Sequence, residues 1–500
     1  MEQKLDRLKA ILAEVIDLKS AQAVLAWDQE TNMPPGGAIG RGYQLGTLAK
    51  IAHQKFTSEE VGQLLEDLEP LPNQLPSDSD VACLIKFTLR QYRKLRRVPS
   101  AYVEEDTIVT SNAYSVWEKA KADSDFNRFR PELERIVGLR RQYASFFQPY
   151  VHVYDPLLDD YEPGLKTAEV KHIFNVLRPQ QIALLQAIAG KPAPEDKFLK
   201  ASYPESTQLE FGKEVITRFG FDWRRGREDL SVHPFTIGFN TGDVRITTRV
   251  EPQRLEMAIF GTMHEAGHAM YEQGIDASLD RTPLASGASM ALHESQSRLW
   301  ENLVGRSRPF WSYFYPRLQQ LFPSQLGNVS LDTFYRGVNR VEPSPIRVNA
   351  DEATYNMHIM LRLELEIALL EGSLEVKDLS AAWNSRMKEY LGLTPPDDAS
   401  GVLQDIHWSH GSFGYFSTYA LGNLVSAQIW EALNAELPDL DKNISQGEFR
   451  PLLAWLREKI HRHGSKFEPQ DLIRKVTGTG ITPEPYMRYL TAKYSEIYHL

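Results

Sequence analysis

A mainly α-helical fold, built as one large helical body with a small β-sheet, is predicted by three features of this sequence. Apolar residues recur with a helical period over most of the chain, in segments that clusters of turn-forming residues separate. A single region departs from this period and is typical of a hairpin. The 500 residues, of which 42% are hydrophobic and 10% aromatic, suffice to bury a large core.

The breaks between helical segments fall at residues 33–37, 70–80 and 190–194, where Pro, Gly and other turn formers gather. None of them is long or biased enough to be an interdomain linker, so we expect one domain over residues 1–500. We hypothesise that the helices of residues 1–120 move as a lid, with the break at 33–37 as the hinge.

The hairpin is predicted from two β-prone runs, 233–239 and 243–250, which flank an Asn-Thr-Gly turn. In the second run Val244 and Ile246 alternate with polar residues. One face is therefore expected to pack on the body while the other presents a cation and a hydroxyl group. A further extended run at 345–349 is a candidate strand of the same sheet.

Composition excludes several classes of function. The net charge of −10 argues against nucleic acid as a partner, because binding to phosphates normally requires a basic surface. No apolar run approaches the roughly 18 residues that cross a bilayer, and neither end resembles a signal peptide, so we expect a cytoplasmic protein without membrane partners. The one cysteine, Cys83, lies in an apolar run and is expected to be a buried small hydrophobe.

A metal centre is predicted on a helix that runs from about residue 251 to Gly274. His264 and His268 are four residues apart, so both imidazoles project from one face and can reach a single ion. Glu265 lies at the edge of that face, where it can act on water without being a ligand. The alternative is two histidines on an amphipathic face, but the apolar surroundings predict a buried helix, where unpaired charge is costly.

The third ligand is predicted to be Glu294, in a second helical pattern that runs to about Val304. Glu301 and Glu272 are the other acidic candidates, and for both we expect a structural role or the orientation of a histidine. A site with two His and one Glu suits catalytic zinc, which lowers the pKa of water to about 7 and polarises a carbonyl group. Glu265 would take the proton and pass it to the leaving amine.

Six motifs occur in order along the chain: HPF at 233–235, DVRIT at 243–247, HEAGH at 264–268, HESQ at 293–296, IRVNAD at 346–351 and GVLQDIHW at 401–408. With these motifs the sequence resembles the carboxypeptidase Taq family of metallocarboxypeptidases. The stretches 27–34 and 413–416 are also similar to the family, except that Ser417 stands where a proline is expected.

This resemblance implies a nearly all-helical, gluzincin-like, saddle-shaped body with a deep active-site groove, in which residues 230–420 hold the catalytic motifs. It implies zinc as the cofactor, with cobalt as a competent substitute, and a homodimer. The expected activity is removal of C-terminal residues from peptides with broad specificity and poor cleavage at proline. Position by position, His264, His268 and Glu294 resemble the metal ligands, and Glu265 resembles the general base.

An exopeptidase must recognise a free carboxylate, and Arg245 or Arg347 supplies the bidentate group that favours such recognition. The sequence leaves open which of the two does so. The structural alternative for either arginine is an ion pair with a neighbour such as Asp243 or Asp351.

Two histidines and two tyrosines lie close together in residues 407–419. Side chains of this type can stabilise a developing oxyanion, and His407 with Tyr419 or Tyr415 are the candidates. His233, before a proline, is expected to line the groove or to cap the hairpin.

A zinc oligopeptidase or endopeptidase is the main alternative, because the metal constellation does not determine which bond of a peptide is cut. Dependence on a free C-terminal carboxylate separates the two readings. An aminopeptidase is disfavoured by the lack of an acidic motif for an α-amine beside HEAGH, and a binding protein without activity is disfavoured by the intact set of ligands and base.

Overall fold

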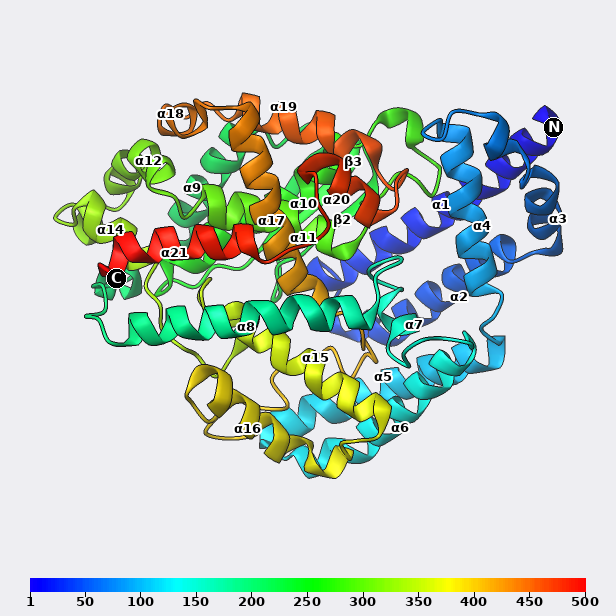
Figure 1. Cartoon of the computed structure of the whole chain (residues 1–500), viewed down its shortest axis with the longest axis horizontal. Coiled ribbons are helices and arrows are strands. Elements are labelled where there is room, and N and C mark those ends of the chain that lie inside the picture. The colour runs from blue at the N-terminus through cyan, green and yellow to red at the C-terminus, as the bar shows by residue number, and fades with distance from the viewer. The chain divides into compact units, whose positions relative to one another are not determined.

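The computed structural model describes the backbone of all 500 residues and the side chains of all except Pro35, Ala38, Ile39, Ser100, Glu104 and Ser111. The fold is mainly α with one small three-stranded sheet, as predicted (Figure 1). The chain divides into two compact units. Unit 1 comprises residues 1–96, 195–338 and 429–480, and unit 2 comprises residues 97–194, 339–428 and 481–500. Because residues 1–120 contribute to both units, their movement as one lid stays a prediction.

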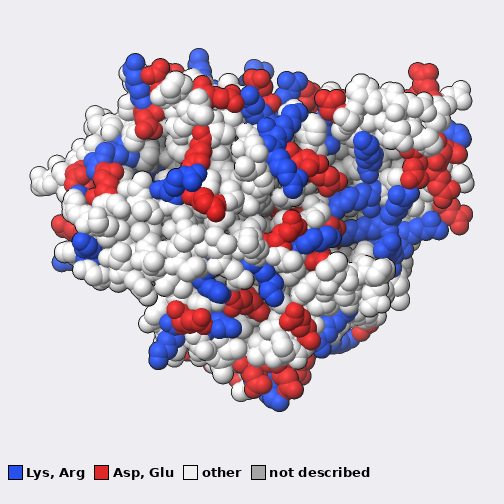
Figure 2. Space-filling view, in the orientation of Figure 1, with Lys and Arg blue, Asp and Glu red and all other residues white. Residues whose placement is uncertain are grey.

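Unit 1 contains the sheet and the helices around it. Its helices are α1 (Glu2–Thr31), α2 (Ala38–Phe56), α3 (Glu59–Leu68), α4 (Asp80–Leu95), α9 (Glu205–Phe219), α10 (Leu255–Gly274), α11 (Met290–Arg298), α12 (Arg308–Leu321), α13 (Pro323–Leu326), α14 (Leu331–Val338), α18 (Leu440–Ser445), α19 (Arg450–Lys459) and α20 (Pro469–Thr477). Basic side chains gather over the C-terminal part of α4 (Figure 2), whose last turn holds Arg93 and Lys94. There they complement the negative end of the helix dipole.

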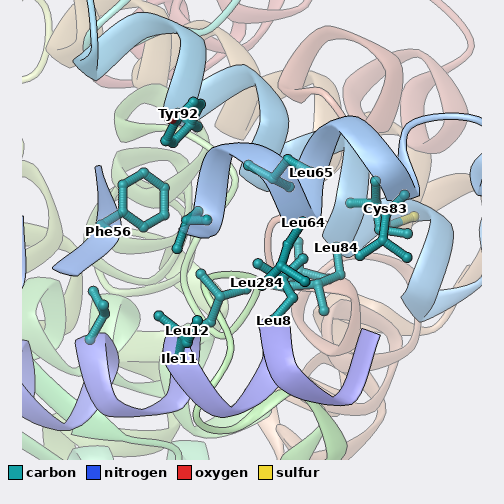
Figure 3. Close-up of a cluster of buried hydrophobic side chains, with 14 of the residues drawn as sticks. Leu8, Ile11, Leu12, Phe56, Leu64, Leu65, Cys83, Leu84, Tyr92 and Leu284 are labelled. Atoms are coloured by element: carbon teal, nitrogen blue, oxygen red, sulfur yellow. The ribbon is translucent and has the colours of Figure 1, made fainter. Parts of the chain in front are cut away.

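A hydrophobic cluster holds the first helices of unit 1 together (Figure 3). Leu8 and Leu12 on α1 lie one turn apart, so they share a face in this cluster, which also contains Leu65 of α3 and Leu84 of α4. Cys83 lies in the same cluster, which confirms that it is buried. Leu284 joins the cluster from the segment before α11, and thereby anchors that segment to the helical body.

The sheet has the order β1-β3-β2, with β1 (Gly226–Leu230) parallel and β2 (Thr236–Asn240) antiparallel to β3 (Asp243–Thr248). The predicted hairpin is therefore confirmed, and Val244 and Ile246 are fully buried as expected. The prediction of an open polar face was wrong at Thr247. This side chain is also fully buried, and its hydroxyl is satisfied by a hydrogen bond with that of Ser231 at 2.7 Å.

The first strand was missed, because its start lies in a run of arginines that is more typical of a solvated surface. A glycine is required there: a Cβ on Gly226 would lie 2.6 Å from the carbonyl oxygen of Val244. The candidate strand at 345–349 was wrong. It forms a short 3-10 turn over Arg347–Asn349, and the sheet is made of β1, β2 and β3.

Unit 2 is helical. Its helices are α5 (Ser100–Asp123), α6 (Phe126–Ser145), α7 (Asp155–Leu158), α8 (Thr167–Ala189), α15 (Tyr355–Glu371), α16 (Leu379–Leu391) and α21 (Glu484–Tyr498), and α17 (Ser417–Glu436) continues from unit 2 into unit 1. Within the unit, α15 packs against α8 and α16, and α21 packs against α8. Among the helices that the structure describes, none has the length and hydropathy of a membrane span.

Candidate metal centre

Helix α10 carries the two histidines and the glutamate of the HEAGH motif. It begins at Leu255, three residues after Pro252, so the predicted start near residue 251 was wrong and Pro252 lies in a turn. The predicted end at Gly274 is confirmed, although the reason differs from a C-cap. A Cβ on Gly274 would lie 2.6 Å from the Cβ of His461, so a glycine is needed there for close packing.

Helix α11 crosses α10 closely at Gly267, the fourth residue of HEAGH. A Cβ on Gly267 would lie 2.7 Å from the carbonyl oxygen of Gln296 and 2.7 Å from the Cα of Ser297. Because the backbones approach this closely, Glu294 of α11 reaches both histidines. Its Oε2 lies 3.3 Å from Nε2 of His268 and 3.6 Å from Nε2 of His264. The structure thus brings the three predicted ligands together.

The other ring nitrogen of each histidine has a partner of its own. Nδ1 of His264 lies 2.9 Å from Oε2 of Glu301, and Nδ1 of His268 lies 2.6 Å from Nδ1 of His293. Both Nε2 atoms therefore face Glu294, and the three donor atoms lie within 4.8 Å of one another. Two imidazole nitrogens and one carboxylate oxygen fit a divalent metal such as zinc, with a coordination position left for a reactant.

Two arginines balance the carboxylates around this centre. The Nε of Arg298 donates to Glu294 at 2.7 Å, and its Nη1 donates to Glu301 at 3.1 Å. Arg306 adds a second positive charge 3.6 Å from Glu301. Burial alone would raise the pKa of both glutamates, but Arg298 and the nearby imidazoles outweigh it. They hold the pKa of Glu294 well below its ordinary range and lower the pKa of Glu301 to about 2, so both are carboxylates at neutral pH.

Glu301 lies in a π-helical segment, Leu299–Val304, that continues α11. The π turn is a common local adjustment at functional sites, and here it follows directly on the residues that carry Glu294 and Arg298. Glu301 is placed to orient His264. The orientation of a histidine was one of the two roles expected for this residue from the sequence.

Glu265 is held by the sheet. The hydroxyl of Thr236, at the start of β2, lies 2.7 Å from Oε2 of Glu265 and 2.9 Å from its carbonyl oxygen. The side chain is 6% exposed, and burial raises its pKa above the ordinary value. A carboxylate with a raised pKa in a fixed position is suited to accept a proton.

Arg245 and His233 also belong to unit 1. The guanidinium of Arg245 forms a bidentate pair with Asp243, at 2.9 and 2.8 Å, and lies 4.4 Å from the ring centre of Trp27. This is the ion pair considered as the structural alternative. His233 is exposed, and its carbonyl oxygen accepts a hydrogen bond from Ser231 at 2.6 Å. Substrate-binding roles for both residues stay predictions.

Arg347 belongs to unit 2 and is buried. Its Nε and Nη2 donate to Oδ1 of Asp405 at 3.1 and 2.9 Å, while Arg362 binds the other oxygen of the same carboxylate. The ion pair of Arg347 with Asp351, which the sequence suggested, was a wrong prediction. The carboxylate of Asp351 instead accepts the backbone N–H groups of Ala353 and Thr354 at the start of α15.

The predicted aromatic cluster of residues 407–419 also lies in unit 2. Nε2 of His407 lies 3.3 Å from the hydroxyl of Tyr419, and the ring of Tyr415 lies 5.4 Å from that of His407 and 5.2 Å from that of Tyr419. Arg347 is 5.0 Å from the ring centre of Tyr419. Burial lowers the pKa of His407 to about 3, so the imidazole is neutral. Their catalytic and binding roles stay predictions.

Sequence reasoning missed several residues of these clusters. Arg298 follows Glu294 by one helical turn, a spacing that could have indicated the pair. Thr236, His293, Arg306 and Asp405 carry no such local signal, since each meets its partner through the tertiary fold.

Comparison with known proteins identifies the family of this chain. The family model described as carboxypeptidase Taq (M32) metallopeptidase matches residues 7–494. The chain belongs to this family. Thermostable carboxypeptidase 1 of Thermus thermophilus is 42% identical over 495 residues, 97% of each chain, and carboxypeptidase 1 of Bacillus subtilis is 38% identical over 491 residues, 98% of each chain.

Its fold agrees with the family. The crystal structure of an M32 carboxypeptidase from Deinococcus radiodurans R1 superposes with a TM-score of 0.97 at 40% identity, covering 100% of both chains. This M32 protein is therefore a metallocarboxypeptidase that acts on peptides, as the motifs predicted.

Proposed function

We propose that this M32 protein is a zinc-dependent, cytoplasmic carboxypeptidase of broad specificity that cleaves poorly at proline and works as a homodimer. The observation that carries the catalytic part is the convergence of three donors, His264, His268 and Glu294, beside the buried carboxylate of Glu265. The resemblance of the motifs supports the specificity and the dimer. Cobalt is expected to replace zinc, because two imidazoles and a carboxylate suit both ions.

His264, His268 and Glu294 would hold the metal ion. When bound, the ion supplies Lewis acidity that polarises a carbonyl group and makes water more acidic. Arg298 keeps Glu294 ionised, and Glu301 keeps Nε2 of His264 directed at the centre. The chain thus presents a fixed set of donors before any substrate arrives.

Glu265 would act as the general base. Thr236 restrains one of its oxygens through a hydrogen bond of 2.7 Å. The raised pKa favours proton uptake from water and proton delivery to the leaving amine of the cleaved peptide.

For recognition of the C-terminal carboxylate, Arg347 is the better candidate of the two arginines. It shares Asp405 with Arg362, so two guanidinium groups face one carboxylate and the cluster carries excess positive charge. Arg245 has its own bidentate acid, Asp243. His407 and Tyr419 are proposed to stabilise the developing oxyanion, and Tyr415 and His233 to contact the substrate.

Mass spectrometry of an unblocked peptide and its C-terminally amidated twin tests this function. The metal-loaded enzyme should remove single residues from the free C-terminus and leave the amide intact, and a peptide ending in proline should persist. Glu265→Gln should lower kcat by about 10²- to 10⁴-fold with the metal content unchanged, because a general base contributes about that much.

Glu256→Gln, on the same helix as Glu265, is the matched control and should retain activity. Internal cleavage of both peptides would favour the oligopeptidase alternative. Full activity of Glu265→Gln would overturn the assigned base. A monomeric mass in sedimentation would remove the homodimer and leave the activity untouched.

A further inference from the structure

The two histidine ligands differ in what holds their outer nitrogen. His264 is bonded directly to the carboxylate of Glu301, whereas His268 meets a third imidazole, that of His293. His293 in turn places its Nε2 2.7 Å from Oε1 of Glu272, which lies one turn beyond His268 on α10. A continuous chain of hydrogen bonds thus runs from Glu272 through His293 to His268.

The positions of the protons along this chain follow from the chemistry of each group. An ionised carboxylate can only accept, so Nε2 of His293 must carry hydrogen. A histidine that binds a metal through Nε2 carries its hydrogen on Nδ1, and Nε2 of His268 is the nitrogen that lies 3.3 Å from Glu294. Nδ1–H of His268 then donates to Nδ1 of His293, the other ring nitrogen of the imidazole that bonds to Glu272.

We propose that Glu272 and His293 are positioning residues, a carboxylate–imidazole relay that fixes the tautomer and ring orientation of His268. The proposal rests on the proposed role of His268 as a metal ligand. A carboxylate that acts directly on a ligand histidine is a common arrangement, and Glu301 provides it for His264. The relay fixes His268 in the same way, except that the imidazole of His293 lies between the carboxylate of Glu272 and the ligand histidine.

The ring of His293 is firmly packed, as a relay requires. A Cβ on Gly287 would lie 2.6 Å from its Cδ2, and the ring of Tyr271 lies 5.2 Å away. Tyr271 is itself held, because its hydroxyl accepts the backbone N–H of Ala288 at 3.2 Å. The side chains of Glu272 and His293 are each 18% exposed, so water competes weakly for these bonds.

Zinc affinity, measured by competition with a chromophoric chelator on the full-length chain, tests the relay without relying on activity. Glu272→Leu and His293→Phe should each weaken zinc binding by about 10- to 100-fold, the usual effect of losing such an outer partner. Glu272→Gln keeps an oxygen that can accept from Nε2–H of His293, so this variant should lose less zinc affinity than Glu272→Leu. It is the control that separates loss of the hydrogen bond from general disruption of the fold.

The double variant gives the decisive comparison. Because Glu272 acts only through His293, Glu272→Leu combined with His293→Phe should bind zinc no more weakly than His293→Phe alone. Additive losses would overturn the relay and indicate independent structural effects. Glu301→Gln, which acts through His264, should add its loss to either variant.

The outcome separates the relay from the metal site itself. Unchanged zinc affinity in all relay variants, with a large loss in His264→Ala, would reject the relay and leave the metal centre intact. Failure of the wild-type chain to bind one zinc ion, or an unchanged affinity of His264→Ala, would reject the metal centre on which the relay rests.

Discussion

The buried charges of unit 1 and those of unit 2 are balanced in opposite ways. Around α10, Glu294 and Glu301 pair with Arg298 and Arg306, and Glu265, held by Thr236, adds a third acidic side chain, so acidic groups outnumber guanidinium groups. In unit 2, Arg347 and Arg362 converge on the single carboxylate of Asp405, so positive charge is in excess. Buried charge that is left unbalanced is costly, and each cluster therefore favours a ligand of the opposite sign.

This difference suits the two ends of a carboxypeptidase reaction. Under the proposed function, the first cluster would hold the metal cation and the second would bind the C-terminal carboxylate of a peptide. The clusters also differ in how they are built. His264 to Glu301 lie on α10 and on α11 with its π-helical continuation, whereas Arg347, Arg362 and Asp405 come from three separate segments.

Asp405→Asn should have the largest effect on stability. Removal of the shared carboxylate leaves two guanidinium groups buried beside each other, and breaking a buried pair in this way costs about 3–5 kcal/mol. Urea unfolding measures the change in the free energy of unfolding. Asp441→Asn, at an exposed position on α18, is the control and should change it little. If both variants changed the free energy of unfolding by an equally small amount, the prediction would fail, and the guanidinium charges of Arg347 and Arg362 would have to be screened by solvent.

The pH dependence of unit 2 should be detectable through Glu366, a fully buried residue of α15. Burial raises its pKa from the ordinary 4.5 to about 7, against the hydrogen bonds from Tyr154, Trp408 and the backbone of Gly414. Between these pH values the folded chain keeps a proton that the unfolded chain has released, so this residue's contribution to stability falls as pH rises.

The free energy of unfolding of wild type relative to Glu366→Gln measures that contribution, since the amide does not titrate. The difference should fall by about 3 kcal/mol from pH 4.5 to pH 7 and then remain level, at 1.36 kcal/mol per pKa unit. A difference that is constant with pH, or one that rises, would contradict the raised pKa.

Gly267→Ala tests how the ligands of unit 1 are brought together. The new methyl group would meet the backbone of Gln296 and Ser297 at 2.7 Å, so α11 must move away and carry Glu294 with it. Stability should fall by about 1–3 kcal/mol, and zinc affinity should fall as well. Gly261→Ala on the same helix is the matched control. Its Cβ meets nothing within 4 Å, and it should retain zinc affinity and gain up to about 1 kcal/mol.

Thr236→Val should have the smallest effect, confined to the base. Loss of the hydroxyl removes one hydrogen bond to Glu265, worth about 0.5–1.5 kcal/mol, so kcat should fall about two- to tenfold at unchanged KM and zinc affinity. Thr236→Ser keeps the hydroxyl and should restore kcat. A loss that serine does not restore would point to packing of the threonine methyl group instead.

The expectations that held are those that depend on residues close together in the chain. The pair at 264 and 268 and the hairpin around 240–242 follow from the periods of a helix and a strand, which short sequences reveal. The run at 345–349 failed for the opposite reason. Its side chains have the β-prone pattern, but Arg347 pairs with Asp405, 58 residues away in the chain. The backbone at Arg347 forms a 3-10 turn instead of a strand.

By itself, the sequence determined the helical class, the metallocarboxypeptidase family and the three residues that converge as candidate ligands, because these depend on local spacing and on ordered motifs. Only the tertiary structure decided the third strand, the partner of Arg347, the contact of Thr236 with Glu265 and the chain from Glu272 to His268. Those depend on where one helix crosses another and which buried group needs a partner, and such contacts between distant segments leave no periodic pattern along the chain.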